Sequence, residues 1–148
     1  MTIVSNSPEE TVEIGRHIGR RLIKGLNVFI CGELGAGKTT LIKGAASAFG
    51  IPERDITSAS YTLIAGYEGQ TPFYHIDLYR LDDIKSIEDS GVFECIGNGK
   101  AAAVEWAEKL EGYAIGDIRV DIAYGENDKR IITIEGIDEK NWDYNQAG

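Results

Sequence analysis

A glycine-rich loop between a short apolar run and a helical segment is the feature that most restricts how this chain can fold. Residues 28–31 are Val-Phe-Ile-Cys, a run typical of a buried strand in a parallel sheet. The loop after it fits the pattern G-x-x-x-x-G-K-[ST], whose fixed positions here are Gly32, Gly37, Lys38 and Thr39. A helix is predicted over residues 38–49, so the pattern indicates an α/β fold with a phosphate-binding loop.

Each residue type in this loop suits the binding of a polyphosphate. Gly32, Gly35 and Gly37 lack side chains, which lets successive backbone amides approach the same anion. The helix that follows turns its unpaired amides and the positive end of its dipole towards that anion. Lys38 adds a mobile cation for the outer phosphates, and the Thr39 hydroxyl is a hard oxygen ligand for Mg²⁺. The loop therefore predicts a site for a magnesium-bound nucleoside triphosphate.

The length and charge of the chain limit its organisation and its partners. Its 148 residues are enough for one domain, spanning 1–148, with a substantial core. It carries 15 Lys and Arg against 24 Asp and Glu, a formal net charge of -9. This acidic balance argues against nucleic acid binding by its own surface. If its pathway involves RNA, we expect a partner to carry that RNA.

The cysteines and the N-terminal segment indicate the compartment. Cys31 and Cys95 are far apart in the sequence and have no CxxC spacing, so we expect both to be reduced. Residues 1–10 lack a basic region followed by an apolar run, and no stretch approaches eighteen apolar residues. These features predict a soluble, cytoplasmic protein that does not associate with a membrane.

Capping signals and periodicity predict a helix before the loop and a β-hairpin after it. Ser7 is placed as an N-cap with Glu10 at the capping-box position, and Gly25 is a stop signal. Residues 61–67 alternate between apolar and smaller or polar side chains, and 73–78 form a second strand after a turn. We expect these two strands to pair in an antiparallel hairpin.

The remaining sequence predicts another buried strand and another hairpin. Residues 80–100 are irregular apart from one short helix, because glycines interrupt anything longer. Residues 101–104 are small and apolar, as in a buried strand. Isoleucine and valine alternate at 118–122 and 132–134 around a turn, which predicts the second hairpin. We expect residues 138–148 to be a loose tail.

Two carboxylates at predicted strand ends are candidates for the chemistry of hydrolysis. Glu105 ends the apolar run 101–104, as in a Walker B strand, and Asp77 ends the strand that begins at residue 73. A carboxylate at such a position holds magnesium or orients the attacking water. On this pattern alone, either residue suits either role.

A polar loop, two histidines and one tryptophan are further features of the sequence that we interpret in structural terms. The loop 57–62 lies between the phosphate-binding loop and Asp77, where switch segments are commonly found. His75 is interpreted as a half-buried strand residue on the same face as Asp77. His17 is interpreted as a solvated helix residue, and Trp106 either as a core residue or as part of the cleft.

Four motifs occur in the order GELGAGKTT, SASYTL, HIDLYRLDD and VEWAEKL. This order, over most of residues 1–136, resembles the TsaE family of small bacterial P-loop ATPases. Many ATPases share the first motif, whereas His-x-Asp-x-Tyr-Arg at 75–80 together with Glu-Trp at 105–106 is much more specific. The resemblance implies a P-loop NTPase-like single domain whose mixed parallel and antiparallel sheet is flanked by helices.

The resemblance also implies a function. Such a chain is expected to be an ATPase, weak alone, that converts ATP to ADP and phosphate with Mg²⁺. Its expected role is in forming threonylcarbamoyl-adenosine next to the anticodon of tRNA, with the TsaB and TsaD proteins. The tRNA would be engaged through TsaD, which agrees with the acidic charge of this chain.

The family's functional positions transfer to named residues of this chain. The nucleotide would be held by the loop residues Gly32, Gly35, Ala36, Gly37, Lys38, Thr39 and Thr40. Thr39 and Glu105 would hold magnesium, and Asp77 would face the phosphates. Catalysis would involve Lys38, Asp77 and Glu105, and Trp106 would be linked to activity.

The switch motif departs from the family pattern. The family usually has Ser-Pro-Thr there, whereas this chain has Ser58, Ala59 and Ser60. Loss of proline removes backbone stiffness, while Ser60 keeps a hydroxyl. Ser58 and Ser60 are the expected switch residues.

Alternative functions share the same scaffold. A small-molecule kinase would need an acceptor pocket and usually an arginine-bearing lid, yet residues 80–100 contain few basic residues. A regulatory module would bind nucleotide without significant turnover. A translation-factor GTPase is disfavoured, since the sequence has neither a D-x-x-G switch nor an N-K-x-D motif.

Overall fold

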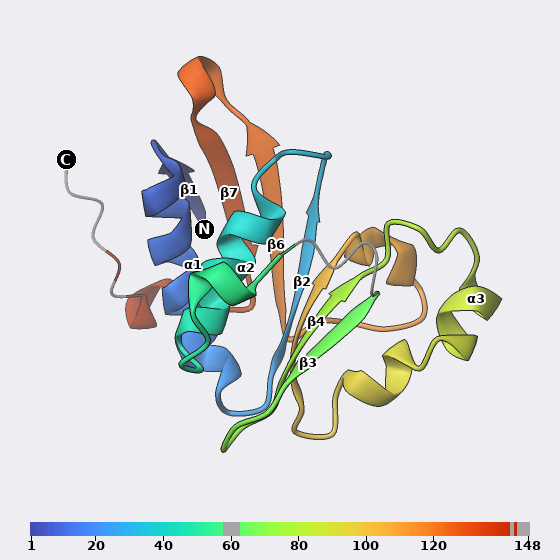
Figure 1. Cartoon of the computed structure of the whole chain (residues 1–148). Helices are drawn as coiled ribbons and strands as arrows, with labels where there is room; N and C mark the ends of the chain where they lie inside the picture. Colours follow the sequence, from blue (N-terminus) through green and yellow to red (C-terminus); the bar gives the residue numbers. More distant parts are fainter. Residues whose placement is uncertain (58–62, 143, 145–148) are drawn as a thin grey trace.

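The structure is a computed structural model that describes residues 1–57, 63–142 and 144. It contains one seven-stranded sheet in the order β1-β7-β6-β2-β5-β4-β3 (Figure 1). The strands are β1 (Thr2–Ser5), β2 (Asn27–Gly32), β3 (Ile64–Tyr67), β4 (Phe73–Asp77), β5 (Ala101–Glu105), β6 (Ile118–Tyr124) and β7 (Arg130–Glu135). The helices are α1 (Pro8–Leu22), α2 (Lys38–Ser47) and α3 (Ile84–Asp89), with short 3-10 turns between elements.

The sheet is mixed, as expected. Strands β4, β5, β2 and β6 are parallel, whereas β3 pairs with β4, and β7 pairs with β6 and β1, in antiparallel fashion. Both predicted hairpins are confirmed as β3–β4 and β6–β7, with residues 61 and 62 of the first outside the described part of the chain. Parallel strands place their carboxyl ends at one edge, and that edge receives the phosphate-binding loop after β2.

Strand β1 was not predicted. It is four residues long and lies at the edge of the sheet, where it pairs with β7, about 130 positions away in the chain. A run of four residues is too short to show a clear alternation of side chains. The pairing with β7 that defines the strand cannot be recognised from the local sequence.

Helix α1 begins and ends where the sequence signals predict. The Ser7 hydroxyl accepts from the backbone N–H of Glu10, and the Glu10 carboxylate accepts from the N–H of Asn6 at 2.8 Å. This arrangement differs slightly from a capping box, in which the carboxylate would reach the N-cap residue itself. Gly25 follows the helix with φ of 92°, a left-handed conformation that glycine adopts without strain.

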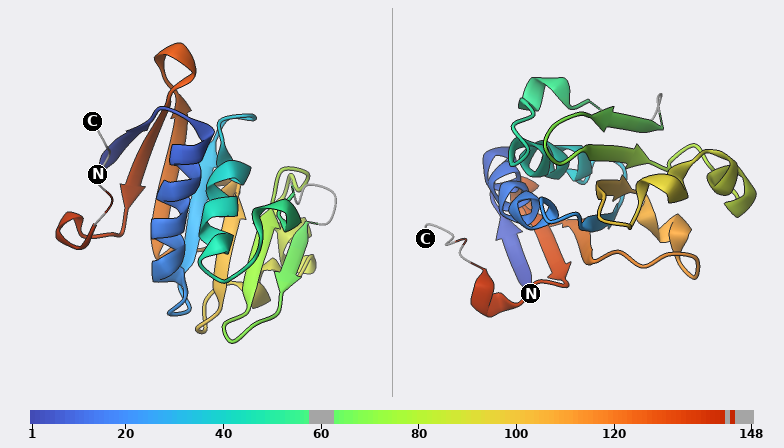
Figure 2. Two further views of the ribbon diagram at one scale, coloured as in Figure 1. Left: turned by 60° about the vertical axis from the view of Figure 1, so that its left-hand side comes forward. Right: turned by 90° about the horizontal axis from the view of Figure 1, so that it is seen from below.

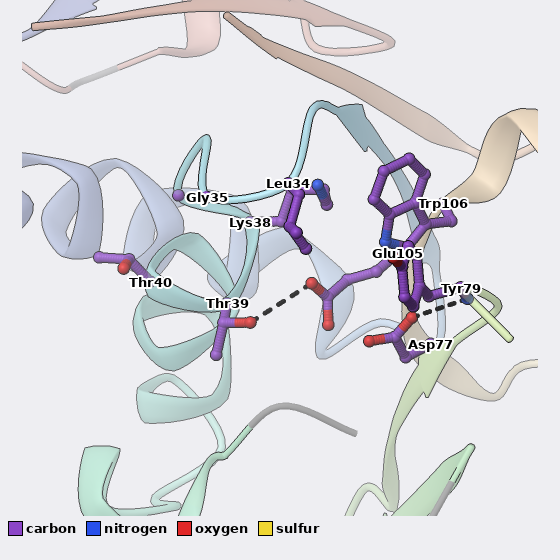
Figure 3. A pocket seen from close by; sticks show the side chains of 10 residues that line it. Leu34, Gly35, Lys38, Thr39, Thr40, Asp77, Tyr79, Glu105 and Trp106 are labelled. Atoms are coloured by element: carbon purple, nitrogen blue, oxygen red, sulfur yellow. Dashed lines mark hydrogen bonds between the residues drawn. The ribbon is translucent and has the colours of Figure 1, made fainter. Parts of the chain in front are cut away.

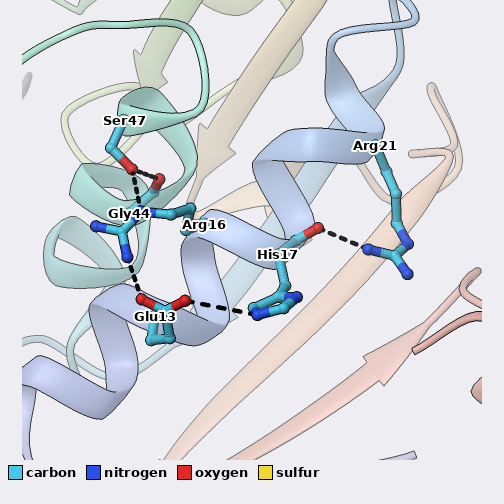
Figure 4. Close-up of polar contacts among 6 residues, drawn as sticks. All are labelled: Glu13, Arg16, His17, Arg21, Gly44 and Ser47. Atoms are coloured by element: carbon cyan, nitrogen blue, oxygen red, sulfur yellow. Dashed lines mark hydrogen bonds and ion pairs between the residues drawn. The ribbon is translucent and has the colours of Figure 1, made fainter. Parts of the chain in front are cut away.

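Helices α1 and α2 pack together on one face of the sheet (Figure 2). A Cβ atom added at Gly15 would lie 2.1 Å from Leu41 O, and one at Gly44 would lie 1.9 Å from Val12 O. The backbones therefore touch at these glycines. Arg16 also crosses to α2, where its Nε donates to the Ser47 hydroxyl at 3.0 Å (Figure 4).

The opposite face of the sheet has its own apolar cluster. Ile87 of α3, Val92 and Leu110 pack against strand residues including Ile76 and Val104, and all five are buried. Asp83 caps α3 by accepting from the Ser86 N–H at 2.8 Å, which confirms the short helix predicted in this irregular region. The sheet is thus covered on both faces, as mixed α/β sheets require.

The part of the predicted tail that the structure describes lies against α1. Residues Glu139–Asn141 form a 3-10 turn, and the guanidinium of Arg21 lies 5.1 Å from the centre of the Trp142 ring. His17 contacts Trp142 and Tyr144, with ring centres 5.6 and 5.5 Å apart. The solvated interpretation of His17 was wrong, because these two aromatic rings cover a helix position that looks polar from its neighbours.

Both cysteines are free, as expected. Within the described residues, no helix has the length and apolar character needed to cross a membrane.

Candidate nucleotide-binding site

The predicted loop, the ends of β4 and β5, and the start of α2 surround one cavity of about 270 Å³ (Figure 3). Its lining consists of Leu34, Gly35, Gly37, Lys38, Thr39, Thr40, Asp77, Tyr79, Glu105 and Trp106. The structure therefore brings together most of the residues that the sequence singled out. Gly32 and Ala36 belong to the same loop but do not line the cavity, and Ser58 and Ser60 lie outside the described residues.

The loop backbone is shaped for an anion. Gly35 and Gly37 have φ values of 80° and 110°, which side-chain-bearing residues rarely adopt. Gly37 is the N-cap of α2 and supplies no side-chain cap to the amides of the first turn. The residues of this first turn, Lys38, Thr39 and Thr40, line the cavity, so the helix terminus can accept negative charge from a ligand.

Lys38 is folded back onto its own loop. Its Nζ donates to Gly32 O at 2.6 Å and to Glu33 O at 2.7 Å, and it lies 4.2 Å from the centre of the Trp106 ring. Burial lowers the pKa of this amine, while the carboxylates of the site, Glu105 first, act to raise it. The cation is thus satisfied by carbonyl oxygens and by an aromatic face.

Thr39 and Glu105 face each other across the cavity. The Thr39 hydroxyl donates to Glu105 Oε1 at 3.3 Å, and Glu105 is 3% exposed. A threonine hydroxyl and a carboxylate are hard oxygen donors, and Mg²⁺ is commonly held by such ligands together with substrate phosphates. This donor pair fits a magnesium ion at the mouth of the phosphate-binding loop.

Asp77 lies beside Glu105 but has a different environment. The two residues are paired in register at the ends of β4 and β5. One Asp77 oxygen accepts from the Tyr79 N–H at 2.9 Å. Burial raises the pKa of Asp77, and the Glu105 charge adds to the effect, while the hydrogen bond from Tyr79 opposes it. Glu105 is hydrogen-bonded to Thr39 and Asp77 is not, so the two carboxylates differ in their hydrogen-bond partners.

Trp106 lines the cleft and is held in a constrained turn. Its φ and ψ are 58° and 37°, and its ring packs on Tyr79 with centres 5.2 Å apart. Lys109 Nζ donates to the carbonyl oxygens of Leu78, Tyr79 and Leu81 at 2.8–2.9 Å. The loops after β4 and β5 are therefore tied together, which fixes the Tyr79–Trp106 wall.

Two residues that sequence reasoning missed support the loop from the β6–β7 hairpin. The Tyr124 hydroxyl donates to Leu34 O at 2.8 Å, and Arg130 Nε donates to Ala36 O at 3.0 Å. The Arg130 guanidinium also stacks 4.5 Å from the centre of the Tyr124 ring. No local pattern could have found them, because only the pairing of β6 beside β2 brings them to the loop.

His75 was predicted to share a face with Asp77 and to be half-buried. It is instead fully buried, and its Nε2 lies 2.6 Å from Glu105 Oε2. The alternation in the sequence identified its face of the sheet but gave no indication of its partner on the neighbouring strand.

Comparisons with known proteins agree with this geometry. The sequence profile described as "Threonylcarbamoyl adenosine biosynthesis protein TsaE" matches residues 5–132. The chain is 40% identical over 110 residues to the tRNA threonylcarbamoyladenosine biosynthesis protein TsaE of Treponema pallidum, covering 74% of this chain and 81% of that protein. It is 35% identical over 133 residues to the protein of the same name from Bacillus subtilis, covering 88% and 82%.

The fold is also similar to a solved structure. The crystal structure of YdiB from Bacillus subtilis superposes with a TM-score of 0.67 at 31% identity, covering 90% of this chain and 83% of that one. The sequence matches and this superposition span the phosphate-binding loop and the flanking sheet alike. The chain therefore belongs to the TsaE family of threonylcarbamoyl adenosine biosynthesis proteins.

Proposed function

We propose that this chain binds ATP with Mg²⁺ and hydrolyses it to ADP and phosphate in support of threonylcarbamoyladenosine formation on tRNA. The observation that carries the proposal is the meeting of a phosphate-binding loop with Thr39, Asp77 and Glu105 in one cavity. Membership of the family supports the role in tRNA modification, and the cavity supports the binding of a nucleotide.

Each side chain has a role in this proposal. Lys38 would exchange its two loop carbonyls for phosphate oxygens of the nucleotide. Thr39 and Glu105 would hold magnesium, which when bound neutralises charge on the transferred phosphoryl group. Asp77, which is not bonded to Thr39, would orient the attacking water. This division assigns separate roles to the two acids that the sequence left interchangeable.

A second cavity suits the nucleoside. It has a volume of about 120 Å³, shares Gly35, Gly37 and Thr40 with the first, and extends to the start of α1 at Ser7 and Thr11. Hydroxyl groups at its wall offer hydrogen bonds to a base or ribose. The triphosphate would then lie over α2 with its nucleoside towards α1.

The acidic chain would reach tRNA through other proteins. We propose TsaB and TsaD as its partners, since a net charge of -9 disfavours direct binding to a phosphate backbone. We also propose that the chain is a cytoplasmic subunit whose turnover is slow alone and depends on the complex.

The test is ATP hydrolysis by the purified chain, alone and with TsaB and TsaD from the same source. We expect stimulation by the two proteins, and we expect Lys38→Ala and Glu105→Ala to abolish it. Lys43→Ala is the matched control, because Lys43 is on the same helix but does not line the cavity. Activity that the partners leave unchanged, or that only a small-molecule acceptor stimulates, would contradict the proposal and favour a kinase.

A further inference from the structure

His75 lies behind the nucleotide cavity and is absent from its lining. Its side chain is fully buried, and its Nε2 is 2.6 Å from Glu105 Oε2. Its other ring nitrogen, Nδ1, has no hydrogen-bond partner among the residues that the structure describes. Glu105 is therefore the polar group towards which this imidazole is directed.

The register of the sheet explains the contact. His75 on β4 is opposite Ala103 on β5, and Glu105 is two residues further along the same face. Side chains two residues apart on a strand lie on the same face of the sheet, so both His75 and Glu105 project from the face that carries Ala103. The small Ala103 side chain leaves room for the imidazole to lean towards the carboxylate.

The two oxygens of Glu105 thus have different partners. Oε2 is paired with His75, and Oε1 accepts from the Thr39 hydroxyl at 3.3 Å. A carboxylate oxygen that holds a metal ion accepts hydrogen bonds, so we assign the Nε2–H of His75 as the donor to Oε2. With one oxygen fixed from behind, the carboxylate cannot rotate, and Oε1 stays turned towards the loop and the cavity.

We propose that His75 is a positioning residue that orients the Glu105 carboxylate for magnesium. This role rests on the proposed function, in which Glu105 and Thr39 hold the ion. Groups that orient a metal ligand typically change metal affinity by about 10- to 100-fold when they are removed. His75 contributes an N–H donor to Glu105 and does not line the nucleotide cavity.

The test is the Mg²⁺ dependence of ADP binding, measured by calorimetry. His75→Leu removes the donor, and we expect about a tenfold rise in the Mg²⁺ concentration needed for half-maximal tightening of ADP binding. ADP affinity in EDTA should be unchanged. His75→Gln should restore the Mg²⁺ dependence, because its amide nitrogen can occupy the place of Nε2. His75→Asn, whose shorter amide does not reach Glu105, should behave like His75→Leu.

Ile76→Val is the matched packing control, since Ile76 is equally buried on the same strand but belongs to the opposite apolar cluster. Thermal unfolding of each variant separates stability from metal binding. If His75→Leu fails to fold, the Gln and Asn variants make the same comparison with polar side chains. The positioning role alone is overturned if the unaltered protein responds to Mg²⁺ and the Leu or Asn variant has the same Mg²⁺ dependence. Unaltered protein that binds ADP without any response to Mg²⁺ overturns the proposed metal site and this role together.

Discussion

At the scale of single residues, the candidate site separates two adjacent carboxylates by their hydrogen bonds. Glu105 shares its oxygens between Thr39 and His75, whereas Asp77 accepts from the backbone of Tyr79. Both are almost fully buried, so each depends on its few donors for stabilisation of its charge. Their separate environments explain how neighbouring acids of one cavity can perform different tasks.

A prediction at this scale concerns Cys31 of β2, which belongs to the apolar cluster on the face of the sheet opposite α1 and α2. Burial raises the pKa of its thiol to about 12, and the neighbouring Glu108 adds to the effect. Because the unfolded thiol ionises at a lower pH, this group's contribution to stability is present below pH 9.0 and is lost as the pH rises towards 12. We expect Cys31→Ala to make the thermal unfolding temperature fall less steeply across that range.

Thiol labelling of the native protein gives an independent check. Cys95 is partly exposed, so it should react first at neutral pH, while Cys31 should react only after denaturation. Labelling of Cys31 in the folded protein at a rate similar to that of Cys95 would contradict this.

At the scale of elements, the α1–α2 pair depends on direct contact between two helix backbones. Glycines at three positions, Gly15, Gly19 and Gly44, allow this approach, since a Cβ at each would lie within 2.3 Å of a carbonyl oxygen of the other helix. The close pairing fixes α2, whose first residues Lys38 and Thr39 line the cavity.

We expect Gly44→Ala to separate these helices. Insertion of a methyl group into a packed contact typically costs about 1–3 kcal/mol, and relaxation here would have to move a backbone rather than a side chain. Chemical denaturation should show this loss, with weaker ADP binding as α2 shifts. Gly69→Ala is the control, because the nearest atom to its added Cβ is 3.7 Å away. Equal stability of the two variants would show that the helix contact is not tight.

The elements also show what the sequence could predict. The loop, α1, both hairpins and the buried strands β2 and β5 have local signals in capping residues, glycines and alternating side chains. Asp77 and Glu105 could be predicted as neighbours of the loop because both follow strands of one sheet. By contrast, β1, Tyr124 and Arg130 depend on strand pairings between distant segments, and the His75–Glu105 contact depends on the register of β4 beside β5.

At the scale of the whole molecule, the site and the C-terminal segment lie at different parts of the structure. The cavity is formed by β4, β5 and α2, whereas Trp142 and Tyr144 pack near Met1 and the outer side of α1. Substitutions of Trp142 and Tyr144 should therefore change stability without changing nucleotide binding.

Trp142→Ala tests this separation. Trp142 packs against the main core cluster and against His17 and Arg21, so we expect a loss of about 1–3 kcal/mol in the free energy of unfolding. ADP affinity should be unchanged. Tyr113→Ala should have little effect on stability, since Tyr113 is 61% exposed. A variant of Trp142 with native stability, or one with impaired ADP binding, would contradict the prediction.

The contacts of Lys38 have a consequence for selectivity among anions. Gly32 O and Glu33 O already accept hydrogen bonds from this cation. The binding free energy of a ligand therefore reflects only the difference between its own contacts with Lys38 and the contacts that it replaces. Chloride has no oxygen atom with which to replace the two carbonyls, and a single sulfate carries less charge than a triphosphate and spans fewer of the donors in the loop. A polyphosphate chain can bind Lys38 and the α2 amides together. The loop therefore binds long, highly charged ligands in preference to the simple ions of the surrounding solution.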